Sequence, residues 1–432
     1  MARRRYVGVG YESSAWGTEA APQYFIDPAS CGVDIPDSPE IIQPGGLNRH
    51  KRNHQPGMYI PGGPTETVFD ISTAYHIIAH AFGGACDFTD ATTEIAEPSP
   101  EELFTTGVGE TTGSDTMGKV PVIPGTLTIQ TAAPADVASD NGFGTLTAEN
   151  ASGVTGTINY ATGALSLIGL TAETAYEAVY FEGETDDIYT HVVTPGTDDT
   201  LHGLSLDVGK DQHQHAFTGC SISQFTITVE KEYAMLNFDV IGEVDKTETI
   251  VAESVVLAKL PRWRPYGDGY PVPFHRVTAK MVDYGGSLAA FQTSLESLSL
   301  TYSNGADGES GVTLGSRNPQ RIWGGEIEIT GEMALVFDGT DELQDFWGGA
   351  SAPADAGTTE KALEITFSSD DTSPIGSIVL SLPKCIFQNV GITASGRERI
   401  IQAVKFEALY DDTATHAIQM TANSIQNWDT CT

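Results

Sequence analysis

Two stretches far apart in the chain share one irregular pattern: CSISQFTI at residues 220–227 and CIFQNVGI at residues 385–392. In each stretch apolar and polar residues alternate, and the alternation then slips by one position, at residues 223–224 and 388–389. Such a slip turns the apolar side chains to the other face of a strand unless a β-bulge absorbs the extra residue. The shared slip therefore predicts two copies of one bulged strand.

The strand that follows each bulge repeats as well. In both copies three apolar residues alternate with polar ones, which is typical of a strand with one buried face. These residues are Leu236, Phe238 and Val240 in the first copy and, in the same order, Val404, Phe406 and Ala408 in the second.

The tripeptide VFD occurs at residues 68–70 and again at residues 336–338. In both places it follows a predicted strand with a Gly-Gly pair and precedes a short predicted helix. Apolar residues at i, i+3 and i+4 indicate each helix, and a second Gly-Gly pair ends it. The first Gly-Gly pairs are residues 62–63 and 324–325, and the helices are residues 71–82 and 341–347.

These repeats predict the domain organisation. Together 46 glycines and 22 prolines separate many short segments rich in β-branched and aromatic residues, which indicates a mainly β fold class. We expect two tandem β-sandwich units, each with one short helix, plus an inserted small β-sandwich or barrel domain. The first unit is discontinuous, over residues 1–100 and 200–250, and the second covers residues 251–432. The insert, residues 101–199, has its own strand pattern and belongs at the surface.

The charge balance is strongly acidic. The chain has 22 Lys and Arg against 58 Asp and Glu, a formal net charge of −36. Affinity for nucleic acid comes largely from cations that neutralise phosphates, so this composition argues against a DNA-binding protein. Two interpretations fit: adaptation to concentrated salt, which screens self-repulsion, and a surface that must not hold a passing polyanion. Regular apolar alternation argues against disorder.

No catalytic, cofactor or metal site is predicted. The five cysteines are widely spaced without a CxxC pair, which fits buried thiols better than a zinc site or disulfide scaffold. His76 and His80 have the i, i+4 spacing of helical zinc ligands but lack the HExxH pattern, so we interpret them as structural. The DQHQH segment at residues 211–215 is interpreted as a turn tip, with adventitious metal binding as the alternative.

Two loops depart from the acidity. Arg49, Lys51 and Arg52 lie in a Gly- and Pro-bounded loop over residues 43–61, and Arg317 and Arg321 lie in the corresponding loop of the second copy. Solvated loops with local ion pairs and DNA contact are two possible interpretations. We favour a third, in which these residues are inter-subunit or inter-ring contacts that dock on an acidic neighbour.

The chain also resembles a known family, the tail tube proteins of long-tailed, siphovirus-like phages. The similarity lies in VGYESSAWGT at residues 9–18, GPTETVFD at 63–70, FTGC at 217–220 and FDVIG at 238–242, in that order. The acid excess is similar to that of proteins from halophilic archaea, which indicates a virus of such a host.

This resemblance implies a structural virion protein and no enzyme: a tail tube subunit, in stacked rings around a DNA-conducting channel. The units would be tail-tube-type sandwiches whose sheets close around a lumen. Single-unit relatives form six-fold rings, so three chains with two units each would give a pseudo-six-fold ring. The implied partners are further copies of the chain and the tape measure, terminator and tail tip proteins. Genomic DNA would pass through without specific binding.

The implied location is the virion tail, assembled in the host cytoplasm, with no membrane and no cofactor. Two other classes stay open. One is another virion structural or surface β-protein, such as a capsid decoration, fibre or adhesin. The other is a secreted carbohydrate-active enzyme, which needs a pair of carboxylates about 5–10 Å apart in a cleft.

Overall fold

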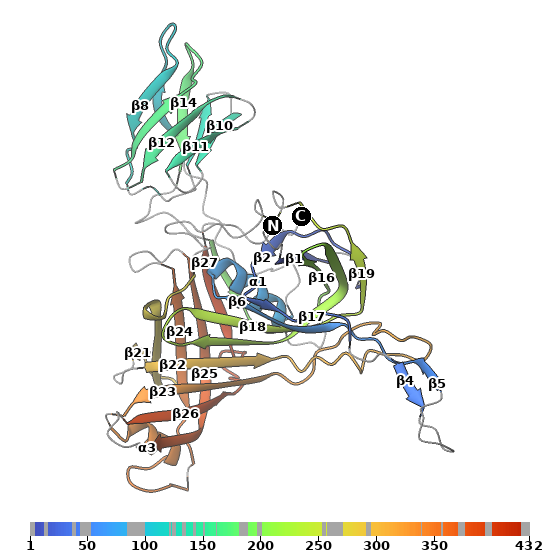
Figure 1. The fold of residues 1–432 in the computed structure, drawn as a ribbon. Coiled ribbons are helices and arrows are strands. Elements are labelled where there is room, and N and C mark those ends of the chain that lie inside the picture. The colour runs from blue at the N-terminus through green and yellow to red at the C-terminus, as the bar shows by residue number, and fades with distance from the viewer. Residues whose placement is uncertain are drawn as a thin grey trace.

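The computed structural model is mainly β, which confirms the expected fold class (Figure 1). It describes residues 5–12, 16–36, 40–43, 53–83, 100–120, 122, 127–131, 135–140, 144–149, 152–160, 162–180, 189–196, 201–252, 256, 271–290, 295–337, 339–355, 357–369, 376–393 and 400–424. Among these residues no helix is long and apolar enough to cross a membrane.

The first unit is a two-layered sandwich around one helix. One layer pairs β2, β1, β16, the first half of β17, and β19; the other pairs β3, β6, β18 and the second half of β17. The bounds are β1 Arg5–Tyr11, β2 Tyr24–Ile26, β3 Ser30–Cys31, β6 Gly62–Val68, α1 Ile71–Ala81, β16 Leu204–Lys210, β17 His213–Val229, β18 Ala234–Ile241 and β19 Val244–Glu248.

The second unit repeats this plan. One layer pairs β21, β20, β24, the first half of β25, and β27; the other pairs β22, β23, β26 and the second half of β25. A 3₁₀ turn, η1 Phe274–Arg276, precedes it. The bounds are β20 Val277–Asp283, β21 Ala289–Ala290, β22 Leu295–Ser303, β23 Glu328–Val336, α3 Asp341–Trp347, β24 Lys361–Ser368, β25 Ser377–Thr393, β26 Ile401–Ala408 and β27 Gln419–Ser424.

The register confirms the predicted bulges. The pairing of β17 with β18 shifts between Ile222 and Gln224, and that of β25 with β26 shifts between Phe387 and Asn389. A second bulge, which the sequence analysis did not predict, lies just before Cys220 and recurs just before the equivalent Cys385. Each 17-residue strand thereby bends out of one layer and into the other, which explains why one strand serves both sheets.

Two details of the predicted repeat are wrong. The strand pairing makes Gln402, Val404 and Phe406 the counterparts of Leu236, Phe238 and Val240, two residues earlier than expected. The counterpart of Gly63 is Gly331 rather than a residue of the 324–325 pair, which lies before β23 begins.

Both helices lie where the sequence predicts. Asp70 caps α1, and its carboxylate accepts the Thr73 amide at 2.8 Å. At the end of α3, Gly348 adopts a left-handed conformation with φ +61°, which glycine adopts without strain. Nine α1 residues are buried, whereas only Glu342 of α3 is.

The insert is a separate eight-stranded sheet with a core of its own. Its strand order is β7-β14-β9-β10-β11-β12-β13-β8, and it stands apart from both units at the top of Figure 1. The bounds are β7 Glu101–Thr105, β8 Thr112–Thr116, β9 Thr128–Thr131, β10 Ala135–Asp140, β11 Thr145–Ala148, β12 Thr155–Asn159, β13 Ala164–Ile168 and β14 Ala175–Val179. The next strand, β15 Tyr189–Val193, pairs with β27 of the second unit.

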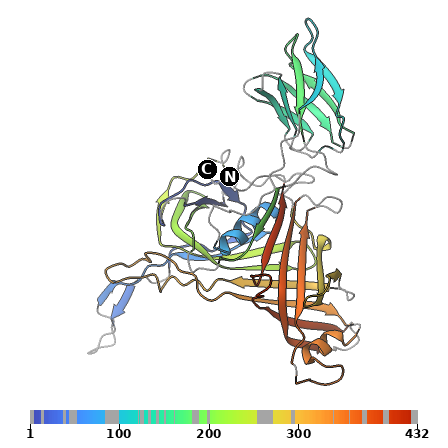
Figure 2. The same cartoon turned by 180° about the vertical axis from the view of Figure 1, so that it is seen from behind.

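A two-stranded hairpin projects away from the units on the side away from the insert, as both views show (Figures 1 and 2). It consists of β4 Glu40–Gln43 and β5 Asn53–Pro56. The hairpin belongs to the long β3–β6 connection. The corresponding connection in the second unit, between β22 and β23, covers residues 304–327.

Candidate functional site: a continuous layer with two free edges

The two units join through strand pairing inside the chain. The second half of β17 pairs antiparallel with β22, from Gln224 opposite Ser303 to Val229 opposite Leu298. On the buried side of this junction the Phe225 and Tyr302 rings stack at 5.2 Å between centroids. On the other side the hydroxyls of Thr226 and Thr301 lie 3.1 Å apart. We call this pairing the internal junction.

The junction produces one continuous layer of eight antiparallel strands, ordered β3-β6-β18-β17-β22-β23-β26-β25. Four strands come from each unit. Because β-strands place alternate side chains on opposite faces, the layer has a face that packs on the core and a face that does not. We call the second one the open face.

The core face is mainly apolar, and its buried polar residues include Thr65, Thr67 and Gln402. Its apolar residues belong to one hydrophobic cluster that spans both units, with Phe238 and Phe406 in equivalent buried strands. Because this cluster continues across the internal junction, the two units share one core. Separating the two units would expose apolar surface to water, and this exposure costs a free energy of about 25 cal/mol per Å².

The open face is polar and acidic. Besides Ser, Thr and Asn, its described residues include five carboxylates and one ammonium, and burial raises the pKa of Asp239 among them. Lys405 lies 3.5 Å from Glu332, so this cation is paired with a carboxylate of the same face. The charged residues are Glu66, Asp239, Glu328, Glu332, Glu407 and Lys405.

Both ends of the layer are edges. Within the described residues, β3 pairs only with β6, and the second half of β25 pairs only with β26. Apolar side chains are exposed at both edges: Ile35 is 51% exposed next to β3, and Ile392 is 40% exposed on β25. Unpaired strand edges bind other strands readily.

The predicted contact residues fall into two groups. Arg317 touches the first unit's loop in the same chain: its Nε donates to the Gly57 carbonyl at 2.8 Å, and its guanidinium lies 5.9 Å from the Tyr59 ring centroid. The Tyr59 amide in turn donates to the Arg317 carbonyl at 2.8 Å. The structure thus brings the two long loops together at Arg317.

Arg321 is placed differently. Its guanidinium lies over the Trp323 ring, 4.7 Å from the centroid. Arg49, Lys51 and Arg52 lie outside the described residues. Free strand edges are expected of such sandwiches, but the sequence analysis did not predict which strands form them. The signal available was the apolar Val390 and Ile392, which repeat the spacing of Phe225 and Ile227.

Burial favours the uncharged forms of the histidines and cysteines of the core. Tyr11 Oη lies 2.8 Å from His76 Nδ1, and burial lowers the pKa of His76 and of His80 to about 3. Burial raises the pKa of Cys385 to about 12 and also raises that of Cys220, which disfavours the reactive thiolate. Among the described residues no cluster of three His, Cys, Asp or Glu side chains could hold a metal.

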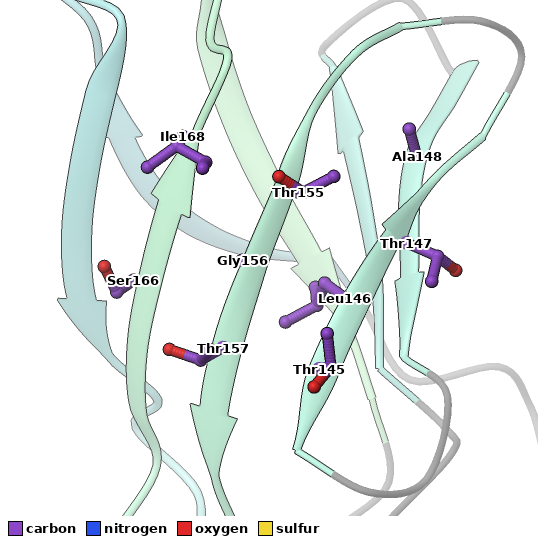
Figure 3. Close-up of a pocket in the computed structure, with 9 residues that line it drawn as sticks. All are labelled: Thr145, Leu146, Thr147, Ala148, Thr155, Gly156, Thr157, Ser166 and Ile168. Carbon is purple, nitrogen blue, oxygen red and sulfur yellow. The ribbon is translucent and has the colours of Figure 1, made fainter.

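A shallow depression on the insert offers no catalytic group either. It lies over β11, β12 and β13, between Thr145 and Ile168 (Figure 3). Threonine, serine and aliphatic side chains line it, with Gly156 at its centre. None of these side chains is an acid or base at neutral pH, so the depression lacks the carboxylate pair that a glycoside hydrolase requires.

One comparison with known proteins identifies the family. The sequence profile described as phage tail tube protein matches residues 2–408, nearly the whole chain. No curated protein matches. The chain therefore belongs to the phage tail tube protein family, whose members are structural proteins of the virion tail.

Proposed function

We propose that this phage tail tube family member forms the wall of the tail tube, as rings of three chains stacked around a channel for DNA. The observation that carries the proposal is the continuous eight-stranded layer with a free edge at each end. A strand layer whose two edges differ joins head to tail, and such contacts close into a ring when the rotation divides a full turn.

The internal junction already supplies one such contact. If the units of neighbouring chains meet as the two units of one chain do, each ring contains six equivalent units in three chains, with pseudo-six-fold symmetry. The layer then has 24 strands. At a spacing of about 4.8 Å, 24 strands enclose a ring at least about 37 Å across, and strand tilt widens it. A DNA double helix passes through such a ring.

The open face suits the lining of this channel. The layer must turn one face inward, and the core face is covered by the second layer of each sandwich. The open face carries more carboxylates than cations, so it repels phosphate and DNA slides past without specific binding. The same acidity across the surface, with a net charge of −36, supports a host that accumulates salt.

The two long loops suit the contact between stacked rings. Arg317 ties the second unit's loop to the first unit's loop. The projecting β4–β5 hairpin then extends beyond the sandwich, as Figure 1 shows. The insert, on the opposite side of the chain from this hairpin, is an ornament rather than part of the wall. Assembly takes place in the host cytoplasm with the tape measure, terminator and tail tip proteins.

Electron microscopy of the purified protein tests the proposal directly. In salt of about 1 M, where the Debye length is about 3 Å, we expect hollow tubes or rings. An average down the axis should show three-fold symmetry with six similar lobes around a hole. Dilution into low salt should dissociate them, because the acid repulsion is then unscreened. Particles without an axial passage would contradict the function, and six chains per ring would contradict the trimer.

A further inference from the structure

We propose that β25 of one chain pairs with the β3 edge of the next chain, in the register that the internal junction sets. The partner is a second copy of this chain. The inference rests on the proposed ring, and it adds which strands meet and which residues lie opposite one another. The basis of the inference is that each free edge has an equivalent strand in the other unit, and these two equivalent strands, β17 and β22, already pair at the internal junction.

The first correspondence is between β17 and β25. Both carry bulges at equivalent positions, so residue 224 corresponds to Asn389 and residue 227 to Ile392, an offset of 165. In β17 this half of the strand binds β22 on its outer side. In β25 the same half has no strand on its outer side among the described residues.

The second correspondence is between β22 and the β3 edge. Ser30 lies opposite Glu66 as Ser297 lies opposite Ala334, and Glu66 is equivalent to Ala334 in the neighbouring strands. An isolated bridge between Asp34 and Gly62 continues the β3 pairing to the position equivalent to Thr301. Residues 31–36 therefore correspond to residues 298–303, an offset of 267.

Together the two offsets define the contact between chains. Phe225 opposite Tyr302 becomes Val390 opposite Ile35, and Ile227 opposite Leu300 becomes Ile392 opposite Val33. Likewise, Thr226 opposite Thr301 becomes Gly391 opposite Asp34, whose carboxylate lies 2.9 Å from the Lys210 ammonium of β16 in the single chain. All of these pairs are antiparallel, as in the internal junction.

The backbone of the β3 edge has the direction that this pairing requires. The amides of Gly32 and Asp34 donate inward, to the Pro64 and Gly62 carbonyls at 2.7 and 3.1 Å. Backbone groups alternate in direction along a strand, so those of Val33 and Ile35 point outward. In the single chain the Ile35 amide donates to the Asp34 carboxylate at 2.8 Å, a local bond that a neighbouring strand would replace.

Burial shows what each edge lacks. At the internal junction Phe225 and Tyr302 are 0% exposed and Ile227 is 1% exposed. Their counterparts at the free edges are partly buried Val390, Ile35 at 51% and Ile392 at 40% exposure. Pairing the two edges would cover these three apolar side chains together.

The composition of the β25 edge also favours pairing. Residues 386–393 contain no charged side chain, in a chain with 80 acidic and basic residues, 22 plus 58. Proteins commonly guard a strand edge that must stay single with charges or proline. This segment lacks both.

Disulfide cross-linking tests the register. In a background with the native cysteines replaced, Asp34→Cys with Gly391→Cys places one thiol on each edge. Thr226→Cys with Thr301→Cys is the matched control inside the chain. The predicted pairs lie about 4.5 Å apart between Cα atoms, within the range for a disulfide. A Cβ on Gly391 meets only the Ala403 carbonyl oxygen, at 3.9 Å, so that cysteine fits.

Oxidation of assembled Asp34→Cys/Gly391→Cys protein should give covalent dimers and trimers and no larger species. Asp34→Cys with Asn389→Cys, two residues out of register, should cross-link at least tenfold less. Equal cross-linking of the two pairs, or none in protein that forms tubes, would overturn the register and leave the tube function standing. If the parent protein forms neither rings nor tubes, the proposed function fails first.

A second variant tests the edge pairing independently, in case the cysteine variants do not assemble. Ile35→Asp places a charge on an exposed position, so the chain should fold with an unchanged circular dichroism spectrum. It should form no rings or tubes, whereas Ile168→Asp, on the insert and 53% exposed, should assemble normally. Normal tubes from the Ile35→Asp protein would overturn the edge pairing.

Discussion

The two units of this chain have the same strand order and connections, but their equivalent side chains differ. Strand order, both bulges and the place of the helix coincide, whereas equivalent side chains differ in burial and charge. α1 of the first unit packs on β17 and also against β25 and β27 of the second unit, so it is covered from two sides. α3 packs on β25 of its own unit, and its Asp345 pairs with Lys361 of β24 at 2.6 Å. The shared features are those that the fold requires, and the differences in coverage show where a unit has a neighbouring unit in the same chain.

The largest difference concerns one pair of equivalent isoleucines. Ile227→Asp would bury a carboxylate at the internal junction, where Ile227 is 1% exposed, and should destabilise the chain by more than about 4 kcal/mol. Ile392→Asp, at 40% exposure, should leave the free energy of unfolding within about 1 kcal/mol of the parent protein and abolish assembly. Chemical denaturation and sedimentation velocity measure the two effects. Equal destabilisation by both substitutions would show that the edge is not free.

The first bulge of each long strand is held by different chemistry. In the first unit Glu12 accepts the amides of Gly17 and Gly219 at 2.7 and 2.8 Å and the Ser205 hydroxyl at 3.0 Å. Burial raises the pKa of this carboxyl, against these hydrogen bonds. In the second unit the equivalent positions are Tyr284 and Lys384, with the ammonium 5.5 Å from the ring centroid.

Glu12→Ala should therefore cost about 2–3 kcal/mol in the free energy of unfolding, because buried donors lose their acceptor. Lys384→Ala should cost much less, because it removes only an exposed ammonium that contacts the Tyr284 ring and pairs with Glu360. Urea denaturation of both variants at pH 7 compares them. A cost for Lys384→Ala as large as that for Glu12→Ala would mean that both bulges depend equally on these side chains.

How much the sequence could predict depends on the kind of pattern. The bulge at residues 388–389 was predictable because a slip in alternation is a local signal that occurs twice. The register of Val404 was predicted two residues wrong, because apolar alternation has period 2 and fits equally well after a shift of two. Which strands form the free edges was not predictable, since the outer partner of a strand is a tertiary property that the apolar Phe225 and Val390 do not reveal.

One of the register corrections exposes a weak point in the second unit. Gln402, equivalent to Leu236, is 0% exposed, and neither its Oε1 nor its Nε2 has a hydrogen-bond partner among the described residues. Gln402→Leu should raise the free energy of unfolding by about 1–3 kcal/mol, because an unsatisfied buried amide is removed. Leu236→Gln should lower it by a similar amount. A destabilised Gln402→Leu protein would show that the amide has a partner.

The smallest effect concerns equivalent carboxylates in β16 and β24. In the second unit Glu364 lies 2.7 Å from the Lys280 ammonium, and in the first unit Gly8 takes the place of Lys280. Asp207, the counterpart of Glu364, is instead buried near Glu248 and Glu19, and burial followed by these charges raises its pKa to about 6. A raised carboxyl pKa means that the folded state binds the proton more tightly than the unfolded state.

Asp207 therefore destabilises the fold progressively as the pH rises from about 4 to about 6, and the full penalty is present at pH 7. Asp207→Asn should raise the free energy of unfolding at pH 7 by about 1–2 kcal/mol and leave it unchanged at pH 4. Glu364→Gln should instead lower it at pH 7 by up to about 1 kcal/mol, since a partly exposed ion pair is lost. Thermal melts of the three proteins between pH 4 and 7 measure the difference. A pH-independent gain in Asp207→Asn would mean that its carboxyl titrates alike in both states, and that the first unit tolerates this charge as easily as the second.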